Sequence, residues 1–234
     1  MPHSPAVSIV VPVYAPGPYI RPLLDSLDAQ EPPEGGFEAV FADDGSPDAS
    51  ADLLEAWARP RPWARVIRLP HSGWPSRPRN VGIAEARGEY VFFVDHDDRL
   101  ADDALQRMTA FASAHGPDVV VGRMAGLGRH VPSRLFAHTV VDARAPETPL
   151  QASMTVHAMF RAAFLSEHGI RFDDTLTRLE DHVFMARRIC PPCGSRCSPI
   201  PRSICTRRAM TARTRGTAPT AHGSTTRRSR GRST

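Results

Sequence analysis

The fold of this chain is decided by one stretch, Val91-Phe92-Phe93-Val94-Asp95-His96-Asp97-Asp98. Its first four residues are apolar, which predicts a buried strand. Three carboxylates follow within four positions. A buried parallel strand that ends in acids places them at the carboxyl edge of a sheet, where α/β folds bind ligands. The stretch therefore predicts both a sheet and a site at its edge.

Asp95 and Asp97 are two positions apart, so in an extended chain their side chains point the same way. Two oxygen ligands on one side suit Mg²⁺ or Mn²⁺ better than zinc. Such an ion takes further ligands from water and substrate phosphates. An acidic helix N-cap after the strand is the alternative, and this segment alone leaves both open.

Strand and helix patterns alternate along the chain up to residue 121. Period-2 or continuous apolar runs predict strands, and i, i+3, i+4 spacing predicts helices. The expected strands are 7–13, 37–42, 65–69, 91–94 and 118–121, and the expected helices are 19–30, 50–58, 80–87, 101–115, 161–168 and 179–189. This order predicts an α/β fold with a mostly parallel sheet flanked by helices.

The composition changes near residue 190. Beyond it stand ten Arg and no acidic residue, whereas residues 1–190 hold 19 Arg against 25 acids. We expect a domain over 1–189 and a disordered Arg/Ser/Thr/Pro-rich tail over 190–234. A basic interaction tail and a shifted reading frame in GC-rich DNA are the two other interpretations. The Cys190-Pro-Pro-Cys193 spacing is that of a metal knuckle or redox pair, but the other cysteines fit no zinc pattern.

Charge and hydropathy limit the classes of partner. The basic pI is a property of the tail, so we expect no nucleic-acid binding by the folded part. No apolar run approaches the ~20 residues that a membrane span needs. The chain enters a strand with no signal peptide before it, which predicts a cytoplasmic protein. Peripheral association with the inner face of the membrane stays open.

Further acids stand where other strands and helices end or begin: Asp43-Asp44 after the second strand, and Glu180-Asp181. Arg79 precedes a predicted helix, and both an arginine and a helix N-terminus favour phosphate. Asp44 could accept a hydrogen bond from the imide N–H of uracil or thymine. Each feature alone has a structural explanation, but their combination predicts a site for a nucleoside diphosphate.

The order of these motifs resembles the inverting family 2 glycosyltransferases with a Rossmann-like GT-A fold. The resemblance spans about residues 6–189. Within that family, the segments 73–80 and 124–132 look like those of the wall teichoic acid, or polyribitol phosphate, glycosyltransferases. A dinucleotide-binding fold is disfavoured, because no Gly-x-Gly-x-x-Gly follows the first strand.

The resemblance assigns five residues to the nucleotide sugar. It places Pro12 and Tyr14 beside the base and ribose, Asp44 at the uracil or thymine edge, and Arg79 and Asn80 at the diphosphate. The donor is then a UDP- or dTDP-sugar. The acceptor is a hydroxyl of a glycan or of a cell-wall polyol phosphate.

The resemblance assigns three acids to the chemistry. Asp95 and Asp97 form the DxD-type pair for Mn²⁺ or Mg²⁺, and Asp95 also faces the ribose and diphosphate. Asp181 is the general base, which removes the proton of the acceptor hydroxyl. Family members continue beyond this point with a helix and a His-containing loop, which this sequence does not show after Ile189. A catalytically inactive, truncated nucleotide-sugar-binding remnant is therefore the alternative function.

Overall fold

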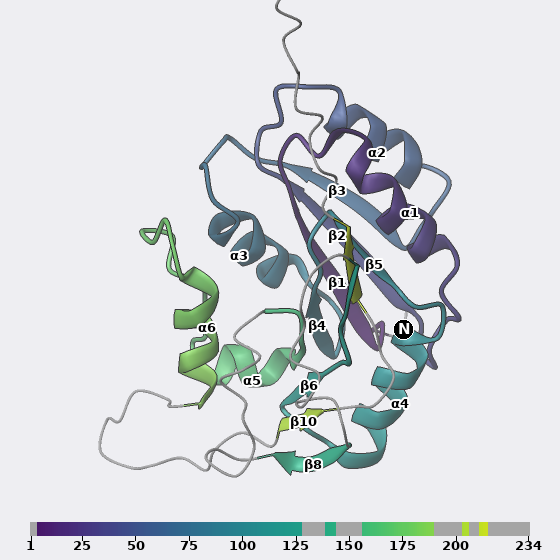
Figure 1. Cartoon of the computed structure of the whole chain (residues 1–234), viewed down its shortest axis with the longest axis vertical. Coiled ribbons are helices and arrows are strands. Elements are labelled where there is room, and N and C mark those ends of the chain that lie inside the picture. The colour runs from purple at the N-terminus through teal and green to yellow at the C-terminus, as the bar shows by residue number, and fades with distance from the viewer. Residues whose placement is uncertain (1–3, 128–138, 144–155, 190–202, 206–210, 215–234) are drawn as a thin grey trace, which may run out of the picture.

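The computed structural model describes residues 4–127, 139–143, 156–189, 203–205 and 211–214 (Figure 1). One large sheet forms its centre. The strands lie in the order β3 (Ala64–Arg68), β2 (Phe37–Asp43), β1 (Val7–Val13), β4 (Tyr90–Phe93), β9 (Met159–Arg161), β6 (Val119–Val121), β10 (Ser203–Cys205) and β8 (Val140–Ala143).

The first half of this sheet is parallel. β1 pairs with β2 on one side and with β4 on the other, and β2 pairs with β3. β9 runs antiparallel between β4 and β6. The predicted α/β fold with a mostly parallel sheet is thus confirmed. The β9 direction matters for the site, because the start of β9 lies beside the end of β4.

Helices cover both faces of the sheet (Figure 1). On one face lie α1 (Arg21–Asp28), α2 (Ser50–Ala58) and α4 (Ala104–His115), and on the other lie α3 (Ser76–Glu85), α5 (Ala162–Glu167) and α6 (Glu180–Ile189). A short 3-10 helix, Gly17–Ile20, leads into α1.

Strand alternation divides the apolar side chains into two cores. Ile9 and Val11 of β1 pack with Leu23 and Leu27 of α1, whereas Val10 faces the opposite way into a core with Ile83 of α3. Both faces of the strand are buried, which explains its continuous apolar sequence.

Two features differ from the sequence expectation. Helix α3 begins at Ser76, whereas the sequence predicts a helix that begins at residue 80. Pro78 lies in the first turn of the helix, where backbone N–H groups have no partner within the helix. A proline, which lacks this N–H, is therefore compatible with the start of a helix. A short strand β5 (Asp98–Leu100) separates the acids from α4. It belongs to a second, three-stranded sheet in the order β5, β11 (Thr211–Thr214), β7 (Ala125–Leu127).

Most of the stretch 190–234 lies outside the described residues. Its described parts are the strands β10 and β11. Cys190, Cys193 and Cys197 fall outside the described residues, so the domain boundary at 189 and the nature of the tail stay predictions. Within the described ranges, no helix has the length and apolar character to span a bilayer.

The contact between α3 and β1 gives a test of the fold. A Cβ atom added at Gly82 would lie 2.1 Å from Val10 Cγ1 and about 3 Å from two other Val10 atoms. We expect Gly82→Ala to lower the free energy of unfolding by about 2 kcal/mol, because overpacking shifts the helix off the sheet. Chemical denaturation measures this. The control Glu85→Ala, at an exposed position of the same helix, should stay within about 0.5 kcal/mol; equal stability of both variants would contradict the close packing.

Candidate active site

The carboxyl ends of β1, β2 and β4 meet at one edge of the sheet and open into a cavity of about 410 Å³. The predicted site residues largely converge here. The cavity is lined by Pro12, Val13, Tyr14, Asp44, Gly73, Trp74, Pro75, Pro78, Arg79, Asp95, His96, Asp97, His157, Glu180 and Asp181. Seven of the eight residues proposed from the sequence are in this set, and Asn80 is not.

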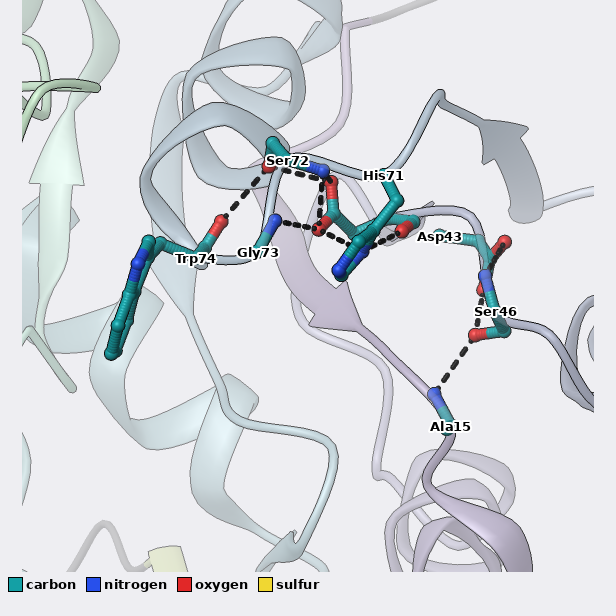
Figure 2. A network of polar contacts seen from close by, with 8 residues as sticks. Ala15, Asp43, Ser46, His71, Ser72, Gly73 and Trp74 are labelled. Atoms are coloured by element: carbon teal, nitrogen blue, oxygen red, sulfur yellow. Dashed lines mark hydrogen bonds and ion pairs between the residues drawn. The ribbon is translucent and has the colours of Figure 1, made fainter. Parts of the chain in front are cut away.

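Asp44 holds the loop that leads from β3 to α3. Figure 2 labels His71, Ser72, Gly73 and Trp74 of this loop. Its carboxylate accepts hydrogen bonds from the Ser72 and Gly73 backbone N–H groups, each at 3.0 Å, and from the Ser72 hydroxyl at 2.7 Å. His71 Nδ1 lies 3.1 Å from Asp44 Oδ2. Asp44 is 3% exposed. Asp44, which the sequence analysis assigns to binding the uracil or thymine base, therefore also anchors the neighbouring loop.

A stacked pair of rings lies next to Asp44. The Tyr14 and His71 rings have centroids 4.2 Å apart and planes inclined by 22°. Both side chains are about half exposed. Gly45 permits this close approach of the two loops, because its φ is +70° and a Cβ there would lie 2.8 Å from the His71 nitrogen. Flat rings beside a buried acceptor suit a planar base with an imide N–H.

Arg79 is the central cation of the site. Its Nη2 lies 2.9 Å from Asp95 Oδ1, and its Nη1 lies 2.7 Å from Asp181 Oδ1 and 3.8 Å from Glu180 Oε1. The guanidinium also lies 5.2 Å from the centre of the Phe172 ring. Arg79 is 3% exposed. Burial alone would lower its pKa, but the Asp95 and Asp181 carboxylates outweigh burial and raise it.

Asn80, the next residue, turns away from the cavity. Its side-chain amide donates to the Phe172 carbonyl at 2.9 Å and to Asp174 Oδ1 at 2.7 Å. Its Oδ1 accepts from the Phe172 N–H at 2.9 Å. In this structure Asn80 thus binds the segment that precedes α6 and lies behind the wall of the cavity.

A second cluster joins Asp95 to Asp98 and His157, neither of which was given a role from the sequence. His157 Nε2 lies 3.2 Å from Asp95 Oδ2 and 3.1 Å from Asp98 Oδ2. Ligand atoms of these three side chains all lie within 4.8 Å of one another, a grouping able to hold a metal ion. Asp98 was visible in the acidic motif. His157 carried no signal, because only the antiparallel course of β9 brings it to the end of β4.

The charge of His157 is set by its two acids. Burial disfavours an imidazolium, but Asp95 and Asp98 outweigh burial and raise the pKa of His157 to about 10. Two carboxylates and an imidazole are a donor set that suits Mn²⁺ better than Mg²⁺, which prefers oxygen alone. Asp95, Asp98 and His157 therefore fit a divalent cation. To be bound by all three side chains, the cation would have to displace the proton from the His157 imidazole.

Two acids on α6 also line the cavity. Glu180 and Asp181 form the first turn of α6 and are partly buried. Leu179, directly before them, has φ of +60°, a left-handed conformation that a leucine rarely adopts, and its side chain is 63% exposed. Such strain concentrates at functional segments.

Comparison with known proteins identifies the family of this chain. Residues 8–164 match the family described as Glycosyl transferase family 2. The chain is 36% identical over 180 residues to the poly(ribitol-phosphate) beta-glucosyltransferase of Bacillus spizizenii, covering 76% of this chain and 28% of that protein. It is also 36% identical over 184 residues to the poly(ribitol-phosphate) beta-N-acetylglucosaminyltransferase TarS of Staphylococcus aureus, covering 76% and 31%. The chain thus spans less than a third of either relative.

A solved structure of similar fold is that of S. aureus TarS 1-349 in complex with UDP-GlcNAc. It aligns with a TM-score of 0.80 and 29% identity, over 90% of this chain and 59% of that one. The resemblance read from the motifs is confirmed by the extent of these matches. The chain belongs to glycosyl transferase family 2 and has the GT-A fold.

Proposed function

We propose that this chain is an inverting glycosyltransferase that moves a sugar from a UDP- or dTDP-sugar to a hydroxyl acceptor. The observation that carries the proposal is that one cavity is lined by Asp44, by Arg79 and by Asp181, with Arg79 Nη1 2.7 Å from Asp181 Oδ1. The proposal puts the base at Asp44, called the base end here, the diphosphate at Arg79, and the sugar and acceptor at Asp181, called the acidic end.

The base end combines a buried acceptor with flat surfaces. Asp44 would accept the imide N–H of the pyrimidine, while Tyr14 and Pro12 flank the base and ribose. Asp44 is already held by the Ser72 and Gly73 amides, so its carboxylate is fixed before the donor arrives. A preformed acceptor loses less entropy on binding than a mobile one.

The acidic end has a carboxylate able to act as general base. Arg79 contacts Asp181 at Oδ1, so among the described residues Oδ2 is the oxygen left for an acceptor hydroxyl. Asp181 would take the hydroxyl proton as that oxygen bonds to the anomeric carbon. The bond from the anomeric carbon to the diphosphate breaks, and the diphosphate leaves with the electron pair. Attack from the opposite face inverts the anomeric centre.

A divalent cation, Mn²⁺ or Mg²⁺, fits beside Asp95. Asp95 and Asp97 would hold it, with Asp98 and His157 close enough to Asp95 to add to the set. The ion would neutralise charge that develops on the departing diphosphate. Arg79, already paired with Asp95, would orient the same group.

The acceptor and the donor sugar are proposed from the relatives. Two of them are poly(ribitol-phosphate) transferases, one of glucose and one of N-acetylglucosamine, and the TarS fragment was solved with UDP-GlcNAc. We therefore propose a polyol-phosphate acceptor and a UDP-hexose donor. The alternative, a nucleotide-sugar-binding remnant without turnover, is an outcome of the second test below.

Donor binding is the first test. We expect UDP to bind about tenfold more tightly with Mn²⁺ than with EDTA, a difference of ~1.4 kcal/mol, because protein and diphosphate share the ion. Asp97→Ala should remove this difference, whereas Asp102→Ala, at an exposed acid outside the cavity, should keep it. Calorimetric titration measures all three. Equal affinity in Mn²⁺ and EDTA would argue against the DxD assignment.

Turnover is the second test. We expect Asp181→Asn to keep UDP-GlcNAc affinity, because the amide oxygen can still accept from Arg79, and to lose turnover by roughly 10²–10⁴-fold. Sugar release or transfer from UDP-GlcNAc is measured, with the surface variant Asp103→Asn as control. Turnover within a few-fold of the parent would remove Asp181 from the role of base. Donor binding without turnover in the parent would favour the inactive remnant.

A further inference from the structure

Two consecutive residues in the first half of α3 point in different directions. Arg79 points into the cavity and contacts Asp181, whereas Asn80 points behind the cavity wall and contacts the segment before α6. Asn80 uses its amide nitrogen and its amide oxygen on the same backbone residue, Phe172. A pair of opposed hydrogen bonds fixes the position of that peptide more strictly than one bond would.

Phe172 connects the Asn80 contact to helix α6. Its ring stacks on Phe184 of α6, with centroids 4.0 Å apart and planes 9° from parallel. Both rings are buried, and both meet Phe93 of β4 edge-on. Phe184 lies three residues after Asp181, which is about one helical turn. The Asn80 contact and the Asp181 carboxylate are thus linked through one stacked pair of rings.

The segment between these two points needs such support. Leu179 holds a left-handed backbone conformation directly before α6, and its side chain is mostly exposed, so burial of this side chain adds little to stabilise that conformation. A strained conformation of this kind persists only where the surroundings determine it. The surroundings are the Asn80 contact on one side of Leu179 and the Arg79–Asp181 pair on the other.

We propose that Asn80 is a positioning residue for the general base: it pins the Phe172–Asp174 segment and so places Asp181 at the acceptor end of the cavity. This inference rests on the proposed function, because the position of Asp181 matters only if Asp181 is the base. It differs from the role expected from the family resemblance, in which Asn80 faces the diphosphate.

The first readout needs no turnover. In the full chain, Asn80→Ala should speed backbone hydrogen exchange over 172–175 and the first turn of α6 by about tenfold or more, since local opening becomes easier. Glu85→Ala, at the exposed far end of α3, should leave this exchange as in the parent. Unchanged exchange in Asn80→Ala would overturn the proposal, whether or not the parent is an active transferase.

The second readout separates positioning from diphosphate binding. Asn80→Ala should lower kcat by about 100-fold, the effect of a small misplacement of a reacting group, while the Kd for UDP stays within about threefold. In an Asp181→Asn background, Asn80→Ala should cause no further loss, because it acts through Asp181. A weaker UDP affinity with unchanged kcat, or an additive loss in the double variant, would overturn the proposal.

A pair of variants that exchanges the side chains of positions 80 and 174 distinguishes loss of this contact from general misfolding. Asn80→Asp keeps an acceptor for the Phe172 N–H but places a second carboxylate against Asp174. Adding Asp174→Asn restores a donor opposite the new acid. The double variant should therefore recover part of the exchange protection and turnover that Asn80→Asp loses, and failure to recover either would count against the Asn80–Asp174 contact. An inactive parent chain that still binds UDP would contradict the proposed transferase activity. The hydrogen-exchange measurement would still decide whether Asn80 positions the start of α6.

Discussion

The structure of the site depends on burying one charged side chain, Arg79. An arginine removed from water is costly unless its donors meet acceptors, so its partners must be carboxylates brought from elsewhere in the chain. Asp95 comes from the end of β4, and Glu180 and Asp181 come from α6. The same guanidinium therefore connects the residue expected at the donor to the residue expected at the acceptor. If α6 moved away from the sheet, Arg79 would lose two of these acids.

Much of this arrangement follows from local sequence. The apolar runs identify the parallel strands, and the acids directly after them identify the active edge of the sheet, because parallel strands end at the same edge. The start of α3 was less predictable. Pro78 and the loop residues before it resemble a turn, whereas in the structure the Arg79 N–H already donates to the Pro75 carbonyl and the helix begins at Ser76.

The contacts that the sequence could not predict join distant segments. His157 reaches Asp95 because β9 runs antiparallel, a direction that no local pattern specifies. Asn80 meets Phe172 across 92 positions of sequence, and the same residue type before a helix could equally face a phosphate. A polar side chain can have several possible partners, and only the tertiary structure decides which of them it contacts. The spacing of apolar residues, by contrast, already indicates in the sequence which face of a helix or strand is buried.

The charges around the cavity explain why these contacts matter together. Four carboxylates lie within 4 Å of the two basic side chains Arg79 and His157, namely Asp95, Asp98, Glu180 and Asp181, and Asp97 lines the same cavity. A diphosphate would add further negative charge to a region that already carries an excess of it. Its entry is favourable only if a cation accompanies it or if basic groups exchange their partners. Because Arg79 is shared by the donor acid and the base, any shift of this arginine toward a diphosphate would weaken its hold on Asp181. A second anchor for α6 that does not depend on Arg79 then becomes necessary, and the neutral contact of Asn80 with Phe172 has that property.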